Sequence, residues 1–147
     1  MSDNFTKCVD FVFKLENVYD KSGNVTWENV SGDKGGLTKY GIDQASHPET
    51  AIKNLSECEA RSIYRKEYWD KVHGDLISWP LCLVVFDIAV NNGVGRAAKW
   101  LQSVVGVQQD GHIGSITVSA ANIHPAKFAT LLLNKREVFY RKISLNT

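Results

Sequence analysis

The sequence predicts a mainly α-helical protein with one irregular, glycine-rich segment near its N-terminus. Its 147 residues, of which 44% are hydrophobic, are enough for one domain with a buried core. Apolar residues recur at helical spacing through most of the chain, whereas residues 17–37 hold four glycines and little helical pattern. We therefore expect residues 1–147 to form a single domain of helices with a small hairpin and loop.

The N-terminal helices are predicted from apolar spacing and from capping signals. The first helix begins at an Asn4 N-cap and ends near Glu16. A loose hairpin is expected around Ser22-Gly23-Asn24. Thr38–Ala45 is predicted as a short helix that stops before a proline. The next helix begins with the capping box of residues 56–59 and runs to Lys71.

The C-terminal helices surround one that is apolar on nearly all sides. It runs over Leu81–Val90 after Pro80, so we expect other helices to enclose it. Asp87 lies inside it and, if buried, must be hydrogen-bonded or functional. Further helices are expected over 94–105, 115–121 and from Pro125 onward. The last of these should turn inward Phe128, Leu131, Leu132, Val138 and Phe139. It should turn outward Lys127, Lys135, Arg136, Arg141 and Lys142.

Charge and hydropathy exclude several classes of function. The chain has 17 Lys and Arg against 16 Asp and Glu, without the basic excess that nucleic-acid binding needs. The longest apolar stretch, within residues 79–90, is far shorter than the roughly 18 residues that span a bilayer. The first residues lack the pattern of a secretory signal, so we expect synthesis in the cytoplasm.

Cysteines and histidines show no metal-binding pattern. Cys8, Cys58 and Cys82 are odd in number and have no CxxC spacing, so we expect three buried free thiols. The four histidines form no HxxxH motif and no cluster with cysteine. We expect no metal and no organic cofactor, and we expect a monomer.

Carboxylates are in excess at the N-terminal end, where residues 1–50 carry 8 acidic and 5 basic side chains. Glu16 at a helix end, followed by a glycine-rich loop, can hold the acid of a glycosidase. Burial against aromatic rings would raise the pKa of such a carboxyl. Asp33 and Thr38 can orient water on the opposite face of a sugar. On residue type alone, a surface carboxylate is the favoured interpretation of Glu16, and an ordinary turn is the favoured interpretation of Asp33.

Several segments resemble the glycoside hydrolase family 108 N-acetylmuramidases of bacteria and phages. Leu15-Glu16-Asn17 is similar to the family's Glu-Gly-Gly signature, although Asn17-Val18 stand where the family has two glycines. Residues 33–42 match the signature Asp-x-Gly-Gly-x-Thr-x-x-Gly-Ile at every defined position. Residues 64–69 resemble a Tyr-x-x-x-Tyr-Trp segment, and residues 86–117 are similar to the family's peptidoglycan-binding region.

The resemblance implies a mainly α, lysozyme-like fold, with a catalytic half over 1–75 and a peptidoglycan-binding-like half over 76–147. It implies hydrolysis of the β-1,4 bond between N-acetylmuramic acid and N-acetylglucosamine, with Glu16 as the catalytic acid. Asp33 and Thr38 are expected to assist the attacking water. Some relatives are phage endolysins and others secretion activators, so we expect action on peptidoglycan at the bacterial cell wall, in the periplasm.

Aromatic and amide side chains are candidates for binding the sugar chain, because rings stack on pyranoses and amides bond N-acetyl groups. These candidates are Tyr40, Tyr68, Trp69 and Asn91, together with Asp110 from the peptidoglycan-binding-like region. Each can also serve the fold, as a core residue or a turn. Two alternatives remain: a peptidoglycan-binding or phage structural module that has lost turnover, and cleavage of another β-1,4-linked aminosugar polymer such as chitin.

Overall fold

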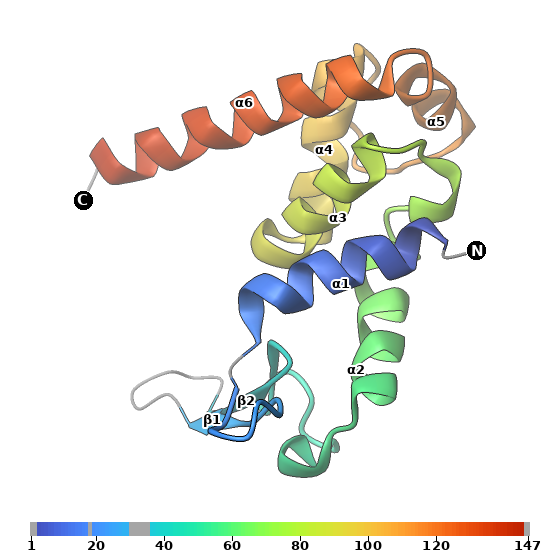
Figure 1. Cartoon of the computed structure of the whole chain (residues 1–147). Coiled ribbons are helices and arrows are strands. Elements are labelled where there is room, and N and C mark those ends of the chain that lie inside the picture. The colour runs from blue at the N-terminus through green and yellow to red at the C-terminus, as the bar shows by residue number, and fades with distance from the viewer. Residues whose placement is uncertain (1–2, 18, 30–35, 146–147) are drawn as a thin grey trace. The chain divides into compact units, whose positions relative to one another are not determined.

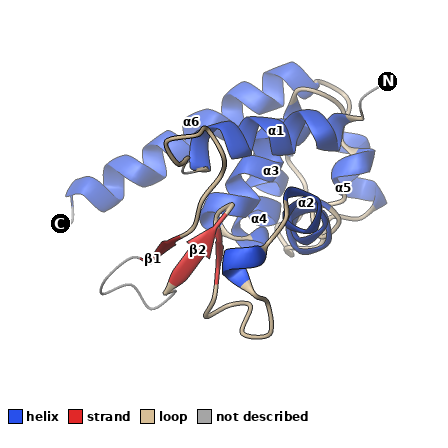
Figure 2. Cartoon of the chain, turned by 60° about the horizontal axis from the view of Figure 1, so that its bottom comes forward, coloured by secondary structure: helices blue, strands red, loops and turns tan. Residues whose placement is uncertain are grey.

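The computed structural model describes residues 3–17, 19–29 and 36–145, apart from the side chain of Glu16. Within them the chain is mainly α, which confirms the predicted fold class (Figures 1 and 2). The helices are α1 (Asn4–Glu16), α2 (Glu57–Tyr64), α3 (Leu81–Asn92), α4 (Val94–Val105), α5 (Ser115–Ala121) and α6 (Pro125–Leu145). The strands β1 (Glu28–Asn29), β2 (Leu37–Lys39) and β3 (Ile42–Asp43) form one antiparallel sheet in that order. A π-helix over Arg65–Trp69 continues α2, and short 3-10 helices cover Ile52–Asn54 and Gly74–Leu76.

Most helices begin where the sequence predicts them, and α4 and α5 match at both ends. The predicted capping box opens α2: Glu59 N donates to Ser56 Oγ, and Ser56 N donates to Glu59 Oε1. The cap of α1 is one residue earlier than predicted. Asn4 is already helical, and Asp3 Oδ1 accepts a hydrogen bond from Thr6 N at 2.8 Å.

A β-hairpin stands where a helix was predicted over Thr38–Ala45. β2 and β3 pair with Lys39 opposite Ile42, so Tyr40 and Gly41 alone form the turn. Their φ angles are +54° and +75°. Positive φ at both central residues is typical of the type I′ turn, whose twist matches that of paired strands. The helix prediction was therefore wrong.

Tertiary contacts hold Tyr40 in this left-handed conformation, which is unfavourable for a bulky side chain. Tyr64 Oη, on α2, donates to the carbonyl of Tyr40 at 2.7 Å. The ring of Phe13, on α1, lies 5.3 Å from the ring of Tyr40. Gly41 is equally constrained, because a Cβ there would lie 2.4 Å from Tyr64 Oη. Helices distant in sequence thus determine the turn.

Contacts divide the chain into two compact units. The larger unit comprises Met1–Cys8 and Lys66–Thr147, and the smaller unit comprises Val9–Arg65. α1 begins in the larger unit and ends in the smaller one. The division into functional halves 1–75 and 76–147 stays a prediction.

The core of the larger unit contains Trp69, which is fully buried. Its ring centroid lies 5.6 Å from those of both Phe5 and Phe86, and its Nε1 donates to Asp75 Oδ1 at 2.8 Å. A Cβ on Gly74 would come within 2.3 Å of the ring, so the backbone also packs closely against it. The structure therefore places Trp69, a predicted sugar-binding residue, in the core and out of reach of a ligand.

α3 is enclosed, as its composition predicts, and Asp87 is its charged residue. Asp87 Oδ2 pairs with Arg136 Nη1 on α6 at 2.5 Å, and Asn91 Nδ2 donates to Asp87 Oδ1 at 3.1 Å. Both partners of the ion pair are largely buried. Asp87 is thus hydrogen-bonded within the fold. Arg136 points inward, contrary to prediction, because a buried carboxylate needs a compensating cation.

The buried side of α6 is narrower than predicted. Ala129 and Leu132 are buried, whereas Leu131 and Val138, both expected to face inward, are 38% and 49% exposed. α6 packs against α3 and α4. Because α6 packs against its neighbours through one side only, that side buries fewer of its apolar residues than the sequence pattern predicts.

The connection between α4 and α5 is organised by Gln102, which is buried. Its Nε2 donates to Asp110 Oδ1 at 2.8 Å and to the carbonyl of His112 at 3.0 Å, and its Oε1 accepts from Gly111 N at 2.9 Å. Hydrogen bonds from His112 N and then Gln102 hold the pKa of the Asp110 carboxyl below its usual value. The predicted turn at Asp110-Gly111 is confirmed, with Gly111 at φ +80°.

The three cysteines differ in exposure: Cys8 and Cys82 are buried, but Cys58 is exposed, so the prediction was wrong for Cys58. A hydrogen bond with Cys82 and burial raise the pKa of the Cys8 thiol. We expect the native protein to take up one thiol-alkylating group, at Cys58, and the denatured protein three. Intact-mass and peptide mapping measure this. A native Cys58→Ser variant that still reacts rapidly would contradict the expectation.

Candidate functional site

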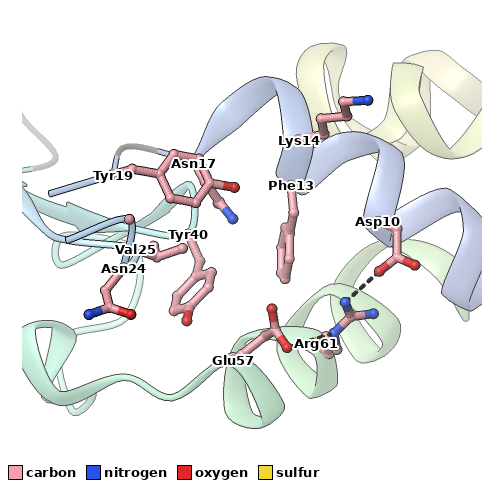
Figure 3. Close-up of a pocket in the computed structure, with 11 residues that line it drawn as sticks. Asp10, Phe13, Lys14, Asn17, Tyr19, Asn24, Val25, Tyr40, Glu57 and Arg61 are labelled. Atoms are coloured by element: carbon pink, nitrogen blue, oxygen red, sulfur yellow. Dashed lines mark hydrogen bonds and ion pairs between the residues drawn. The ribbon is translucent and has the colours of Figure 1, made fainter. Parts of the chain in front are cut away.

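The smaller unit contains a pocket of about 490 Å³, surrounded by the end of α1, the hairpin that follows it, the β2–β3 turn and α2 (Figure 3). The hairpin is confirmed by an antiparallel bridge between Tyr19 and Val25. From α1 and the residue after it, the lining residues are Asp10, Phe13, Lys14 and Asn17. From the hairpin, the turn and α2 they are Tyr19, Gly23, Asn24, Val25, Tyr40, Glu57 and Arg61.

Arg61 is held between two carboxylates at the side of this pocket (Figure 3). Its Nη2 pairs with Asp10 Oδ1 at 2.5 Å, and its Nε lies 3.7 Å from Glu57 Oε2. The guanidinium carbon lies 5.4 Å from the ring centroid of Phe13. Ion pairs this exposed add little stability. Their main consequence is that two carboxylates and one cation have defined positions beside the pocket.

Two tyrosines add aromatic surface and hydroxyl groups to the pocket. Burial, followed by the charges of Glu57 and Tyr19, raises the pKa of Tyr40. The phenol of Tyr40 therefore remains neutral near pH 7 and can both donate and accept a hydrogen bond. Aromatic faces beside a small number of placed polar groups are typical of small-molecule and sugar sites.

Glu16, the predicted acid, is the last residue of α1, and its side chain lies outside what the structure describes. Lys14 and Asn17, its near neighbours, line the pocket. Asn17 N donates to the carbonyl of Phe13 at 3.0 Å, which continues the helical ladder past Glu16. Within the described residues, Asn17 Oδ1 is a buried acceptor without a partner, and such an atom is unusual in a folded protein.

The other predicted catalytic residues are less well placed with respect to the pocket. Asp33 lies outside the described residues. Thr38 is half-buried in β2, opposite Glu28 of β1 and Asp43 of β3, and is not among the described residues that line the pocket. Tyr40 does line it. Over the part of the chain that the structure describes, no group of three or more His, Cys, Asp or Glu side chains could hold a metal ion.

Besides Trp69, three predicted binding residues belong to the larger unit. Tyr68 is half-buried in the π-helix. Asn91 is exposed and donates to the carbonyl and carboxylate of Asp87. Asp110 lines a cavity of about 230 Å³ with Thr117 and their neighbours. Asn91 and Asp110 thus take part in hydrogen bonds within the fold.

Sequence reasoning missed Asp10, Lys14, Glu57 and Arg61 as pocket residues. One signal was available, because Asp10, Lys14 and Asn17 recur at helical spacing along one side of α1. The pairing of Arg61 with Asp10 joins positions 51 residues apart and has no local signal.

Comparison with known proteins identifies the family. The model of the family described as Glycosyl hydrolase 108 matches residues 15–93, more than half of the chain. The structure titled "Structure of Brucella abortus SagA" is 32% identical, with a TM-score of 0.74 over 94% of this chain and 79% of that chain. The similarity confirms the fold class that the resemblance implied. Among curated proteins no match was found. The chain belongs to the glycosyl hydrolase 108 family.

Proposed function

We propose that the protein is a peptidoglycan hydrolase, a lysozyme-type N-acetylmuramidase that cleaves the β-1,4 bond between N-acetylmuramic acid and N-acetylglucosamine. The match to a glycosyl hydrolase family over residues 15–93 carries this proposal, because that range begins at the helix end bearing Glu16 and includes most of the pocket. Glu16 donates a proton to the glycosidic oxygen as the bond to the anomeric carbon breaks, and water attacks that carbon.

Other residues assist these two steps in the proposal. Asp33, Thr38 or both orient the attacking water, and Tyr40 packs against a sugar ring. Glu16 is the last residue of α1 and directly precedes Asn17, which lines the pocket. Tyr68, Asn91 and Asp110 stay candidates for binding more distant parts of the glycan. The biological setting is the bacterial cell wall, as endolysin or secretion activator.

The test is incubation of the purified protein with purified peptidoglycan sacculi, followed by turbidity, by the yield of reducing ends and by product masses. We expect fragments that end in reducing N-acetylmuramic acid. Fragments ending in reducing N-acetylglucosamine would contradict the bond assignment. Binding to sacculi without any release of reducing ends would favour the non-catalytic module, for which the replacement of two glycines by Asn17-Val18 is the supporting observation.

Arg61→Met tests whether the pocket holds substrate. Met keeps much of the aliphatic stem of Arg61 but removes the guanidinium, which lies beside the ring of Phe13 and between Asp10 and Glu57. We expect kcat/KM on peptidoglycan to fall by about tenfold or more, while the thermal midpoint changes little because the ion pairs are exposed. Arg141→Met is the matched control, since Arg141 also pairs with a glutamate four residues away, but on α6. Equal losses in both variants would contradict the role of the pocket.

A further inference from the structure

One side of α6 carries lysines and aliphatic residues in alternation. The residues are spaced by three or four positions, so successive members lie one turn apart on the same side of the helix. We call this set the lysine face: Lys127, Leu131, Lys135, Val138, Lys142 and Leu145. Its three aliphatic side chains are 38%, 49% and 86% exposed. A solvated helix side would not need these aliphatic residues.

The opposite side of α6 is already occupied by the fold of the larger unit. Leu132 is fully buried there, Arg136 pairs with Asp87 on α3, and Tyr140 Oη donates to Asn92 Oδ1 at 3.2 Å. In Figures 1 and 2 the C-terminal turns of α6 extend past α3 and α4. The lysine face is therefore not the packing face, and it is available to a partner.

An aromatic side chain borders the lysine face. Trp100 of α4 lines a cavity of about 160 Å³ together with Lys135, Val138, Phe139 and Lys142. Trp100 and Phe139 are in edge-to-face contact, with centroids 5.1 Å apart. The surface thus combines an indole, exposed aliphatic groups and lysine ammonium groups within a few helical turns.

The lysine face is cationic and contains no acidic residue. For its three lysines no ion pair occurs within the described part of the chain. The acidic residue of α6, Glu137, is paired with Arg141, which lies on another side of the helix. The face therefore complements an anionic partner and has no charge of its own that would oppose one.

We propose that the lysine face of α6 docks the protein on the surface of an anionic phospholipid bilayer. A lipid surface offers phosphates to lysine beside acyl chains that accept leucine and valine, and tryptophan favours this interface. A soluble glycan would satisfy the lysines but would leave the aliphatic side chains in water. The proposed contact is peripheral. Among the described residues no helix is sufficiently long and apolar to cross a membrane.

The experiment is co-sedimentation of the full chain with vesicles of equal parts phosphatidylglycerol and phosphatidylcholine, and with vesicles of phosphatidylcholine alone. We expect binding to the anionic vesicles only, weakened by salt. One lysine at such a surface contributes about 1 kcal/mol, which is about fivefold in partitioning. Lys135→Glu combined with Lys142→Glu should therefore lower the partition coefficient by about 25-fold or more. Leu131→Ser combined with Val138→Ser should weaken the binding that remains at high salt.

Lys66→Glu combined with Lys71→Glu is the matched control, because both lysines are exposed in the larger unit and the change in net charge is the same. We expect the partition coefficient of this control on anionic vesicles to stay within a few fold of the wild-type value. All variants should keep the wild-type thermal midpoint and the wild-type activity on soluble wall fragments. Equal binding to neutral vesicles, or an equal loss in the control, would overturn the proposal. Binding to a soluble anionic polysaccharide that needs the lysines but not Leu131 and Val138 would show a glycan site instead.

Discussion

Glu16→Gln is expected to lower kcat on purified peptidoglycan by about 10²–10⁴-fold, the usual contribution of a general acid. The amide has nearly the same size as the carboxyl but has no proton that it can donate to the glycosidic oxygen. Substrate binding should persist, since the polar lining of the pocket is unchanged. Reducing-end release under saturating substrate measures the loss, and a pull-down with sacculi measures the binding that remains.

Glu49→Gln is the control for this substitution, because Glu49 is exposed and is not among the described residues of the pocket. It should retain full activity. Glu16→Gln activity within about tenfold of wild type, with an unchanged thermal midpoint, would contradict the assignment of Glu16. Glu57 and Asp10, the two carboxylates beside Arg61, would then be the next candidates for the acid.

Gly41→Ala is expected to destabilise the protein by about 3–4 kcal/mol. A left-handed alanine costs about 1–2 kcal/mol through its backbone alone. In addition, the new Cβ would lie 2.4 Å from Tyr64 Oη, so the hydroxyl must move and give up its buried hydrogen bond to the carbonyl of Tyr40. Urea denaturation measures the change. Because Tyr40 lines the pocket, activity should also fall.

Two variants separate the clash from the backbone strain. Gly23 has φ +84°, and a Cβ added there would meet no atom within 4 Å, so Gly23→Ala should cost only the strain, about 1–2 kcal/mol. In a Tyr64→Phe background the oxygen is absent and the next ring atom is 3.8 Å away, so Gly41→Ala should cost no more than Gly23→Ala. Equal costs for Gly41→Ala and Gly23→Ala in the wild-type background would contradict the proposed clash.

Sequence periodicity predicted the helices well wherever local signals and the fold agree. The bounds of α4 and α5 follow from apolar spacing interrupted by glycines, and the capping box at Ser56 is a purely local device. The prediction of a helix over Thr38–Ala45 was wrong because the positive φ of Tyr40 depends on contacts with Tyr64 and Phe13. Because residues of two helices hold this hairpin, its own short sequence does not predict it.

The candidate site was predictable in part for the same reason. A helix end at Glu16 follows from local spacing, and the family signatures provide the residues around it. The pocket depends on contacts between segments far apart, such as that of Asp10 with Arg61. On α6, the sequence does not reveal that Arg136 pairs with Asp87, so Arg136 was placed outside. Val138 was placed inside because the buried side of α6 is narrower than the spread of its apolar residues.

In sequence, the smaller unit of the chain is an insertion in the larger one. The larger unit comprises residues from both sides of Val9–Arg65, which is the inserted segment. The first turn of α1 therefore contributes to the core of the larger unit, because Phe5 packs on Trp69 and Phe86. A fragment that starts at Lys66 would lack this ring, so we expect removal of the first turn of α1 to destabilise the packing of Trp69 and Phe86 before it removes the first pocket residue, Asp10.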